Sequence, residues 1–147
     1  MTDEHYMKLA LEEARRALEE GEVPIGAVIV TNDRIVGRGH NLVETLNDVT
    51  AHAEMQAITA AADTLGGKYL NECTIYVTVE PCAMCAGALG WAQVGRLVFG
   101  ASDPKKGYRT VYRDERGPLH PRTSVTSGVM ENECSILMTD FFKSLRK

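Results

Sequence analysis

The hydrophobic positions along the chain follow two different periods. Apolar residues recur at three- and four-residue steps over residues 3–20, which predicts an amphipathic helix. The same period predicts a closing helix over 130–146, whose expected inward positions are Met130, Cys134, Leu137, Met138, Phe141 and Leu145. Apolar, β-branched runs predict strands over residues 23–30, 34–39, 73–79, 96–100 and 124–127. Further helices are expected over residues 51–65 and 82–91.

This order of elements favours one architecture. Two strands, a helix, a strand, a helix and a strand, then a variable region and a closing helix, predict a three-layer α/β/α fold with a mixed five-stranded sheet. The short Asn32–Asp33 link predicts an antiparallel hairpin at one end of that sheet. A chain of 147 residues can bury a substantial core, so we expect residues 1–147 to form a single domain.

Composition narrows the class of protein. Hydrophobic residues make up 44% of the chain and charged residues 24%, which is typical of a soluble globular protein. No apolar run approaches the roughly 20 residues that cross a membrane, so no membrane partner is expected. The acidic N-terminus does not fit a signal peptide, and cysteines committed to a metal suit a reducing compartment, so we expect a cytoplasmic protein.

The distribution of charge matters more than its sum. The chain carries a net charge of −4, yet residues 104–122 contain six basic and two acidic residues. Cations interleaved with aromatic rings suit a single-stranded nucleic-acid platform, although a solvated surface loop is the alternative interpretation. The possible RNA contacts are Lys105, Lys106, Tyr108 and Arg109.

Two short motifs carry the chemistry. His52 and Glu54 lie two residues apart, and Cys82 and Cys85 follow Pro81 thirty residues later. One imidazole and two thiols supply three ligands to a zinc ion (Zn²⁺), whereas a structural zinc site usually closes with four protein ligands. Three ligands and a nearby carboxylate therefore predict a zinc site that keeps one position open for water.

Helix geometry can bring these residues together. Pro81 suits the first turn of a helix, which would set Cys82 and Cys85 on one side of that turn. Thr50 is a plausible N-cap for a helix that begins near residue 51. We expect the two helix starts to face each other across the metal. The remaining cysteines, Cys73 and Cys134, are expected in the core.

The donor set indicates which reaction such a site performs. Thiolates donate charge to zinc, so the metal should acidify water less than a site of three histidines would, and a base is needed nearby. Glu54 is the carboxylate of the motif that can serve. It would take a proton from the attacking water, return it to a ring nitrogen and help ammonia to leave. The predicted chemistry is hydrolytic deamination of a nucleobase.

The motifs extend into longer segments that resemble a known family. The sequence is similar to the cytidine deaminase-like superfamily and, within it, to the bacterial tRNA-specific adenosine deaminases that convert wobble adenosine to inosine. The segments that carry the resemblance are Val23-Pro24-Ile25-Gly26-Ala27-Val28, His40-Asn41, Thr50-Ala51-His52-Ala53-Glu54, residues 76–88 around Glu80-Pro81-Cys82-Ala83-Met84-Cys85, and Val98-Phe99-Gly100-Ala101-Ser102-Asp103.

The resemblance assigns roles to individual residues. It implies a cytidine deaminase-like fold, zinc held by His52, Cys82 and Cys85, and a proton shuttle at Glu54. It also implies a tRNA anticodon loop as substrate and a homodimer whose RNA groove draws on both subunits. The residues it implies at the target base are Asn41, Ile25, Val79 and Ala53.

Two alternatives stay open. Residues 104–128 depart from the usual family pattern and the chain is acidic overall, which leaves room for a deaminase of a free base or nucleoside of the guanine, cytosine or adenosine type. A non-catalytic, zinc-stabilised RNA-binding module is the second alternative. It would lack the open zinc position beside Glu54. Asn41, for its part, could be an ordinary turn residue at a strand end.

Overall fold

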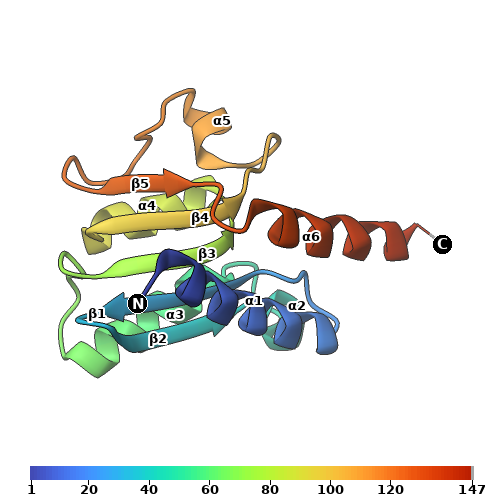
Figure 1. The fold of residues 1–147 in the computed structure, drawn as a ribbon, viewed down its shortest axis with the longest axis horizontal. Coiled ribbons are helices and arrows are strands. Elements are labelled where there is room, and N and C mark those ends of the chain that lie inside the picture. The colour runs from blue at the N-terminus through green and yellow to red at the C-terminus, as the bar shows by residue number, and fades with distance from the viewer. Residues whose placement is uncertain (147) are drawn as a thin grey trace.

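The computed structural model describes residues 1–146, and in this range six helices surround one sheet of five strands (Figure 1). The helices are α1 (Asp3–Glu19), α2 (Val43–Leu46), α3 (Ala53–Leu65), α4 (Ala83–Ala92), α5 (Tyr108–Tyr112) and α6 (Glu131–Leu145). The strands are β1 (Gly26–Thr31), β2 (Arg34–His40), β3 (Thr74–Val79), β4 (Arg96–Ala101) and β5 (Ser124–Ser127).

The sheet is mixed, as the order of elements predicts. Its strands run in the order β2-β1-β3-β4-β5. Strand β1 pairs antiparallel with β2 and β3, whereas β3, β4 and β5 are parallel. Asn32 and Asp33 close the expected hairpin with φ angles of 50° and 57°. Two consecutive positive φ angles belong to the tight turn whose twist matches that of paired strands.

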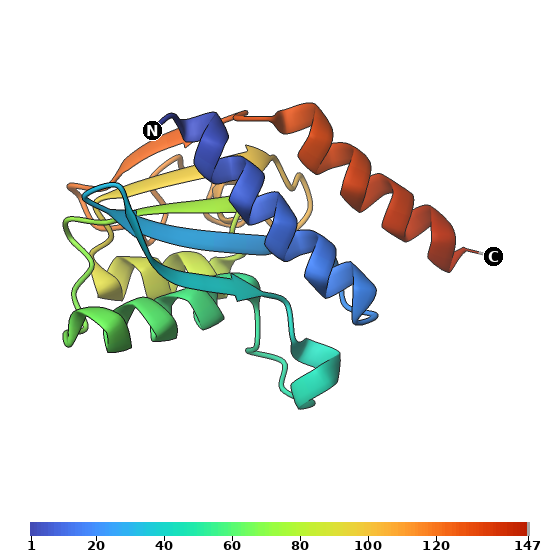
Figure 2. The same cartoon turned by 60° about the horizontal axis from the view of Figure 1, so that its bottom comes forward.

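Helices cover both faces of the sheet, which gives the predicted three layers (Figure 2). On one face α1 packs on β1, β3 and β4, and Cys134 anchors the start of α6. On the other face α3 and α4 bury their alanine-rich sides against Ile29, Ile75 and Leu97 of the strands. Each face therefore has its own apolar core. Cys73 and Cys134 are both buried, so their assignment to the core is confirmed.

Small residues bring the helices unusually close to the strands. A Cβ atom added to Gly26 would lie 2.1 Å from the carbonyl oxygen of Ala10 in α1. A Cβ atom added to Gly39 would lie 2.3 Å from the carbonyl oxygen of Ala53, at the first residue of α3. Both distances are shorter than any ordinary contact, so glycine is required at each position.

The structure departs from the predicted elements at several points. Helices α2 and α5 are short additions that no hydrophobic period announces. The predicted inward face of the closing helix is wrong at its end, because Leu145 is 64% exposed. Only the first turns of α6 meet the sheet, and the helix then extends past the sheet edge (Figure 1). Within residues 1–146, no helix is long and apolar enough to cross a membrane.

The topology gathers polar segments at one edge of the sheet. Strands β2, β3 and β4 end there, and the antiparallel β1 begins there. The segments that follow β2, β3 and β4 therefore meet the segment that precedes β1. Those segments hold Asn41, Cys82, Lys106 and Ile25. The carboxyl edge of parallel strands is where α/β folds commonly bind ligands.

Candidate active site

His52 and Glu54 are presented by the start of α3. His52 occupies the N-cap position with an extended backbone, and Glu54 lies in the first turn. The prediction that Thr50 caps this helix is wrong. Its hydroxyl donates a hydrogen bond of 2.8 Å to Asp48 Oδ1, because residues 48–50 form a turn of their own before the helix. The N-cap residue of this helix is His52. Its imidazole does not cap the helix and contacts the sulfur of Cys82 instead.

The two cysteines are presented in the same way by the start of α4. Cys82 is the N-cap residue of α4, and Cys85 lies one turn further on. Pro81 directly precedes the cap, and a bridge between Cys82 and Gly107 ties this loop to the segment after β4. The positive end of the helix dipole favours a thiolate at this position.

The three candidate ligands converge on one point. His52 Nδ1 lies 3.6 Å from Cys82 Sγ and 3.5 Å from Cys85 Sγ. Bond lengths of about 2.0 and 2.3 Å in a tetrahedral zinc site put nitrogen and sulfur ligands about 3.6 Å apart. The donor atoms all lie within 4.8 Å of one another, and within residues 1–146 no further histidine, cysteine or acidic ligand joins the cluster. The residues present therefore fit an open zinc site.

The charges of the cluster also fit a cation. The pKa of Cys82 falls to about 4, because the Cys85 thiol and then the His52 ring donate hydrogen bonds to its sulfur. The same contact with Cys82 raises the pKa of His52 and, together with burial, raises the pKa of Cys85. Negative charge is thus held at one sulfur with protons crowded around it. A divalent cation held by His52, Cys82 and Cys85 would replace those protons and satisfy both sulfurs.

Glu54 lies beside this cluster and is buried. It is 4% exposed, and burial raises the pKa of its carboxyl to about 7. A carboxyl group whose pKa lies near neutrality can both accept and return a proton. His52 and Glu54 both lie at the N-terminal end of α3, so a shift of α3 moves the candidate base and one candidate ligand together.

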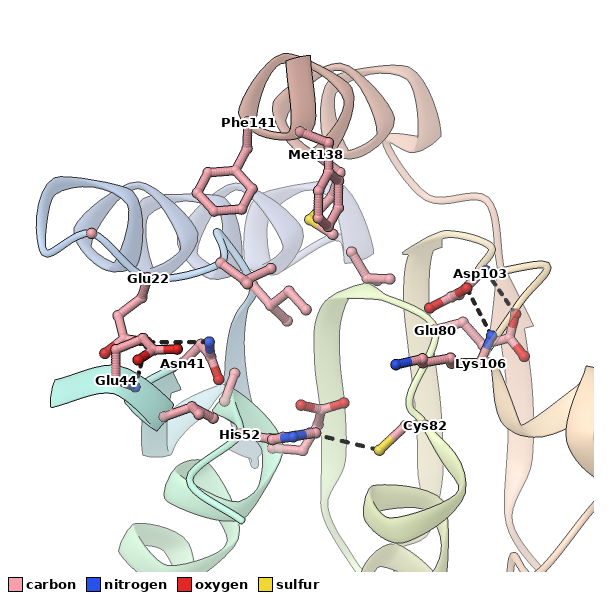
Figure 3. A pocket seen from close by; sticks show the side chains of 18 of the residues that line it. Glu22, Asn41, Glu44, His52, Glu80, Cys82, Asp103, Lys106, Met138 and Phe141 are labelled. Atoms are coloured by element: carbon pink, nitrogen blue, oxygen red, sulfur yellow. Dashed lines mark hydrogen bonds between the residues drawn. The ribbon is translucent and has the colours of Figure 1, made fainter. Parts of the chain in front are cut away.

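A pocket of about 560 Å³ opens above these residues (Figure 3). That volume lies in the range of small-ligand sites. All four residues that the resemblance implies at the base, Ile25, Asn41, Ala53 and Val79, line the pocket, and Asn41 is buried. Sequence reasoning missed a wall of the pocket, which α6 supplies with Met138, Phe141 and Phe142. A helical period identifies an apolar face but does not say whether a core or a pocket covers it.

The basic segment divides into two groups. Lys105 and Lys106 are exposed, and Lys106 also lines the pocket. The stacking role expected of Tyr108 is not available, because its ring is fully buried and its hydroxyl donates to the Glu115 carbonyl oxygen at 2.9 Å. Arg109 is held 3.2 Å from Glu80 and packs over the Phe99 ring. Its first partners are therefore within the protein.

A second hollow of about 490 Å³ adjoins the pocket. Its basic lining comes from the loop after β4 and from the end of α6, two segments that lie far apart in the sequence. The residues are Lys105, Lys106, Lys143 and Arg146. The clustering of Lys143 and Arg146 with the loop could not be expected from their own sequence context, where basic residues at a helix end match the dipole.

An open histidine–cysteine–cysteine cluster beside a buried glutamate, at the ligand-binding edge of this α/β sheet, defines a zinc-binding deaminase domain. The family described as the cytidine and deoxycytidylate deaminase zinc-binding region matches residues 1–101. That match covers more than half of the chain, and the chain belongs to this deaminase family.

Relatives narrow the comparison. The chain is 48% identical to the tRNA-specific adenosine deaminase of Bacillus subtilis (strain 168), over 99% of this chain and 91% of that protein. A structure from a study of A-to-I editing by tRNA:A34 deaminases is 44% identical, with a TM-score of 0.82 over 90% of this chain and 98% of the other. The X-ray structure of guanine deaminase from Bacillus subtilis is 36% identical, with a TM-score of 0.67 over 77% of this chain and 69% of the other.

Proposed function

We propose that this protein hydrolytically deaminates the wobble adenosine of a tRNA to inosine, with zinc as its cofactor. The observation that carries the proposal is the open three-ligand cluster with Glu54 beside it, at the floor of a pocket that suits a single base. The choice of tRNA rests on the relatives, two of which are described as acting on tRNA. A target base of a loop can turn out of its stack into such a pocket.

The zinc site and Glu54 have separate roles in the proposed reaction. His52, Cys82 and Cys85 would hold the zinc ion, which supplies Lewis-acid activation of water. Glu54 takes a proton from the attacking water and delivers it to a ring nitrogen of the base. It then helps to move a proton to the departing amino group, which leaves as ammonia. The raised pKa of Glu54 supports this double role.

The pocket walls select and orient the base. Ile25 and Val79 offer apolar surface to its faces, and Ala53 leaves room beside the zinc ligands. Asn41 is buried in the same wall and offers its amide to a polar edge of the base. A buried amide beside these apolar surfaces helps to set the orientation of a planar ligand, because a wrongly placed polar edge would leave that amide unpaired.

The RNA backbone is proposed to follow the basic hollow beside the pocket. Lys105 and Lys106 are the contacts expected from the sequence, and Lys143 and Arg146 extend the same surface. Each neutralised phosphate releases counterions, so RNA affinity should fall steeply with salt. Replacement of Lys105 and Lys143 by alanine should weaken stem-loop binding about uniformly across sequences and lower the salt slope by about one unit per lost contact.

A homodimer is the proposed assembly, and α4 is its proposed interface. Trp91 is 86% exposed, and Met84 lies two turns before it on the same side of α4. Gly87 between them has open space around it, so a partner helix can approach closely. The cytoplasm is the proposed compartment, because Cys73, Cys82, Cys85 and Cys134 form no disulfide with one another.

Deamination of free guanine is the second candidate function. It is favoured by the structural similarity to a guanine deaminase at 36% identity. The pocket volume admits a free purine as well as a base attached to RNA, so volume does not separate the two functions. The basic hollow separates them, because a free base has no phosphate to place there.

The separating experiment offers the purified zinc-loaded protein four substrates in parallel. These are an anticodon stem-loop with adenosine at the wobble position, free guanine, free cytosine and free adenosine, with ammonia release as the common readout. A stem-loop with guanosine at the wobble position is the matched control. The proposal predicts inosine in the adenosine stem-loop and no ammonia from the control.

Ammonia released only from free bases or nucleosides would remove tRNA from the account and leave the deaminase chemistry standing. Binding of the stem-loop without any ammonia would instead favour a zinc-stabilised RNA-binding module. The Glu54→Gln variant should keep its zinc and lose activity by at least about 100-fold, the scale of a general acid–base contribution. Full activity of this variant would refute the role given to Glu54.

A further inference from the structure

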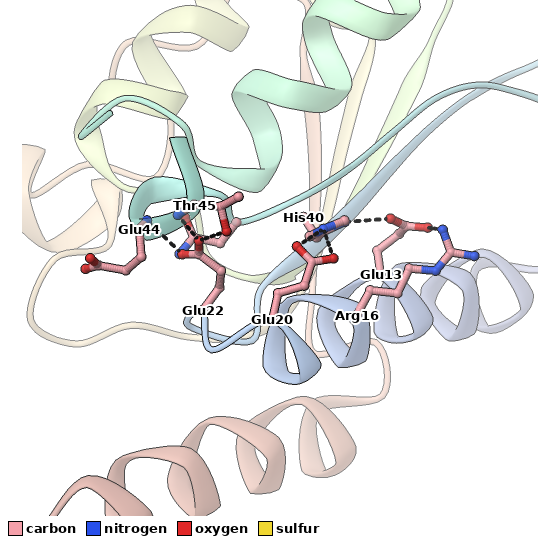
Figure 4. A network of polar contacts seen from close by, with 8 residues as sticks. Glu13, Arg16, Glu20, Glu22, His40, Glu44 and Thr45 are labelled. Atoms are coloured by element: carbon pink, nitrogen blue, oxygen red, sulfur yellow. Dashed lines mark hydrogen bonds and ion pairs between the residues drawn. The ribbon is translucent and has the colours of Figure 1, made fainter. Parts of the chain in front are cut away.

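A buried carboxylate, Glu22, lines the same pocket, apart from the candidate zinc cluster and Glu54. Glu22 follows α1, and its residue is fully buried. Its oxygens accept hydrogen bonds from the backbone N–H groups of Glu44 and Thr45, at 3.0 and 2.6 Å, and from the Thr45 hydroxyl at 2.7 Å (Figure 4). The carboxylate therefore caps α2 from outside and ties this short helix to the segment between α1 and β1.

Glu22 is ionised despite its burial. Burial alone would raise the pKa of its carboxyl, but the hydrogen bonds from Thr45 and from the backbone of Glu44 outweigh that effect, and the net pKa lies below its ordinary value. The nearby His40 acts in the same direction. An ionised carboxylate is an acceptor at both oxygens and can never donate.

This property decides which way the Asn41 amide faces. Asn41 Nδ2 lies 3.4 Å from Glu22 Oε1, a long hydrogen bond that adds little stability. Turning the amide over would put its oxygen against the carboxylate, where two acceptors repel each other. Figure 3 shows the result, with the amide nitrogen directed to Glu22 and the amide oxygen on the side toward His52. Asn41 thus meets the pocket with a hydrogen-bond acceptor.

We propose that Glu22 is the positioning residue that fixes the amide of Asn41, and thereby makes this wall of the pocket select a base that presents an N–H donor there. The proposal rests on the proposed function, because it gives Asn41 a base to hold. Glu22 acts through Asn41 and need not contact the base itself. The exocyclic amino group of adenine, which is also the group that leaves in the reaction, is a donor of the required kind, whereas an exocyclic carbonyl at the same place would meet a second acceptor.

A second set of contacts fixes the position of Asn41 relative to Glu22. His40, the residue before Asn41, contacts two carboxylates of the α1 segment, Glu13 through Nδ1 at 3.1 Å and Glu20 through Nε2 at 3.1 Å (Figure 4). Arg16 approaches Glu13 from the side, at 3.3 Å. The end of β2 is therefore clamped to the end of α1 on both sides of the imidazole. Movement of Glu22 relative to Asn41 would have to break these contacts.

The variant that tests the proposal is Glu22→Gln. An amide at this position can still accept from Thr45 with its oxygen, and its NH₂ group then faces both Asn41 and the backbone N–H of Glu44, whose hydrogen bond is lost. The Asn41 amide should turn over and present N–H to the pocket. The expected result is a loss of about 10- to 100-fold in kcat/KM on the adenosine stem-loop, the scale of one misplaced or unpaired buried polar group. Zinc content should be unchanged.

Thr45→Val is the matched control. It removes the 2.7 Å hydrogen bond to the same carboxylate but leaves the contact between Glu22 and Asn41 in place. A merely structural role for Glu22 predicts similar losses of activity from both variants. A positioning role predicts that Thr45→Val stays within about threefold of wild type even where its melting temperature falls as much.

A double-mutant cycle supplies the decisive comparison. If Glu22 acts through Asn41, then Glu22→Gln should change kcat/KM by less than about threefold in an Asn41→Ala background. An equal loss in both backgrounds would overturn the proposal. Should the Gln variant fail to fold, Glu22→Asp enters the same cycle, since its shorter carboxylate keeps the charge and loses the reach to Asn41.

A hydrogen-exchange measurement tests the same proposal without relying on enzyme activity. In ¹⁵N-labelled protein, the side-chain NH₂ of Asn41 should exchange slowly with solvent in wild type and faster in Glu22→Gln, with the Thr45→Val signal close to wild type. If the wild-type protein were inactive on every base, the proposed function would be refuted, but the exchange measurement would still test whether Glu22 orients the Asn41 amide. Unchanged exchange in Glu22→Gln would overturn the positioning role by itself.

Discussion

Gly39→Ala should damage the active site from the far side of α3. The added Cβ would lie 2.3 Å from the carbonyl oxygen of Ala53, 2.7 Å from the nitrogen of Ala57 and 2.8 Å from Cβ of Gln56. An ordinary contact needs about 3.4 Å, so the first turn of α3 must retreat by about 1 Å. Ala53 stands between the candidate ligand His52 and the candidate base Glu54, and both must move with it.

The expected magnitude follows from that displacement. Overpacking at such a contact costs about 1–3 kcal/mol of folding stability, or a melting temperature lower by several degrees in a chain of this size. A misplacement of about 1 Å in the reacting groups lowers kcat about 100-fold, which corresponds to about 2.7 kcal/mol in the barrier. Activity should therefore fall far more than the folded fraction does.

Gly37→Ala provides the matched control on the same strand. Its Cβ would lie 2.5 Å from the carbonyl oxygen of Ala57, one turn further along α3 and away from the candidate zinc ligands. We expect a similar loss of melting temperature and a loss of kcat below about tenfold. The assay is kcat on the adenosine stem-loop at saturating substrate, with zinc content and melting temperature measured on the same preparations. Equal losses of kcat in both variants would refute the reasoning, because activity would then follow stability and not position.

Two further predictions concern residues outside the pocket. Tyr108→Phe should lower stability by about 0.5–1.5 kcal/mol through the lost hydrogen bond to the Glu115 carbonyl oxygen, and should leave stem-loop affinity unchanged in a binding titration. Hydrogen bonds from Arg96 lower the pKa of Asp3 below its ordinary 3.8, so their stabilisation is fully present above that pH and is lost as pH falls through the lower folded value. Asp3→Asn should therefore be less stable than wild type by about 1 kcal/mol at pH 7, and denaturant titrations from pH 7 to 3 should show that difference shrinking. A difference that stays constant with pH would contradict the ion pair as its cause.

The sequence predicts the fold well, and it also predicts that His52, Cys82 and Cys85 come together, because both depend on local patterns. Helical and strand periods set the element order, and the hairpin follows from Asn32–Asp33 alone. The candidate ligands lie in two short motifs at helix starts, so their approach requires only that two helix ends meet. That meeting is in turn dictated by parallel crossover connections.

The misses arise where tertiary contacts decide the outcome. Tyr108 stands among basic residues in the sequence, but its N–H bonds to the Pro81 carbonyl oxygen and draws the ring into the core. Phe141 belongs to a helical period that indicates an apolar face. Because α6 extends past the edge of the sheet, this part of the face lines the pocket and is not packed in the core. Glu22 is one of many acidic residues near α1, and only burial distinguishes it from its solvated neighbours.

The central claim is an open zinc site, and X-ray absorption at the zinc edge tests it most directly. The wild-type protein should hold one zinc per chain, with two sulfur neighbours at about 2.3 Å and two nitrogen or oxygen neighbours near 2.0–2.1 Å. In Cys85→Ala one sulfur neighbour should disappear. Glu54→Gln should leave the spectrum with the same two sulfurs and one histidine while activity is lost. A metal-free wild-type protein, or a fourth ligand from the protein in place of water, would contradict the account.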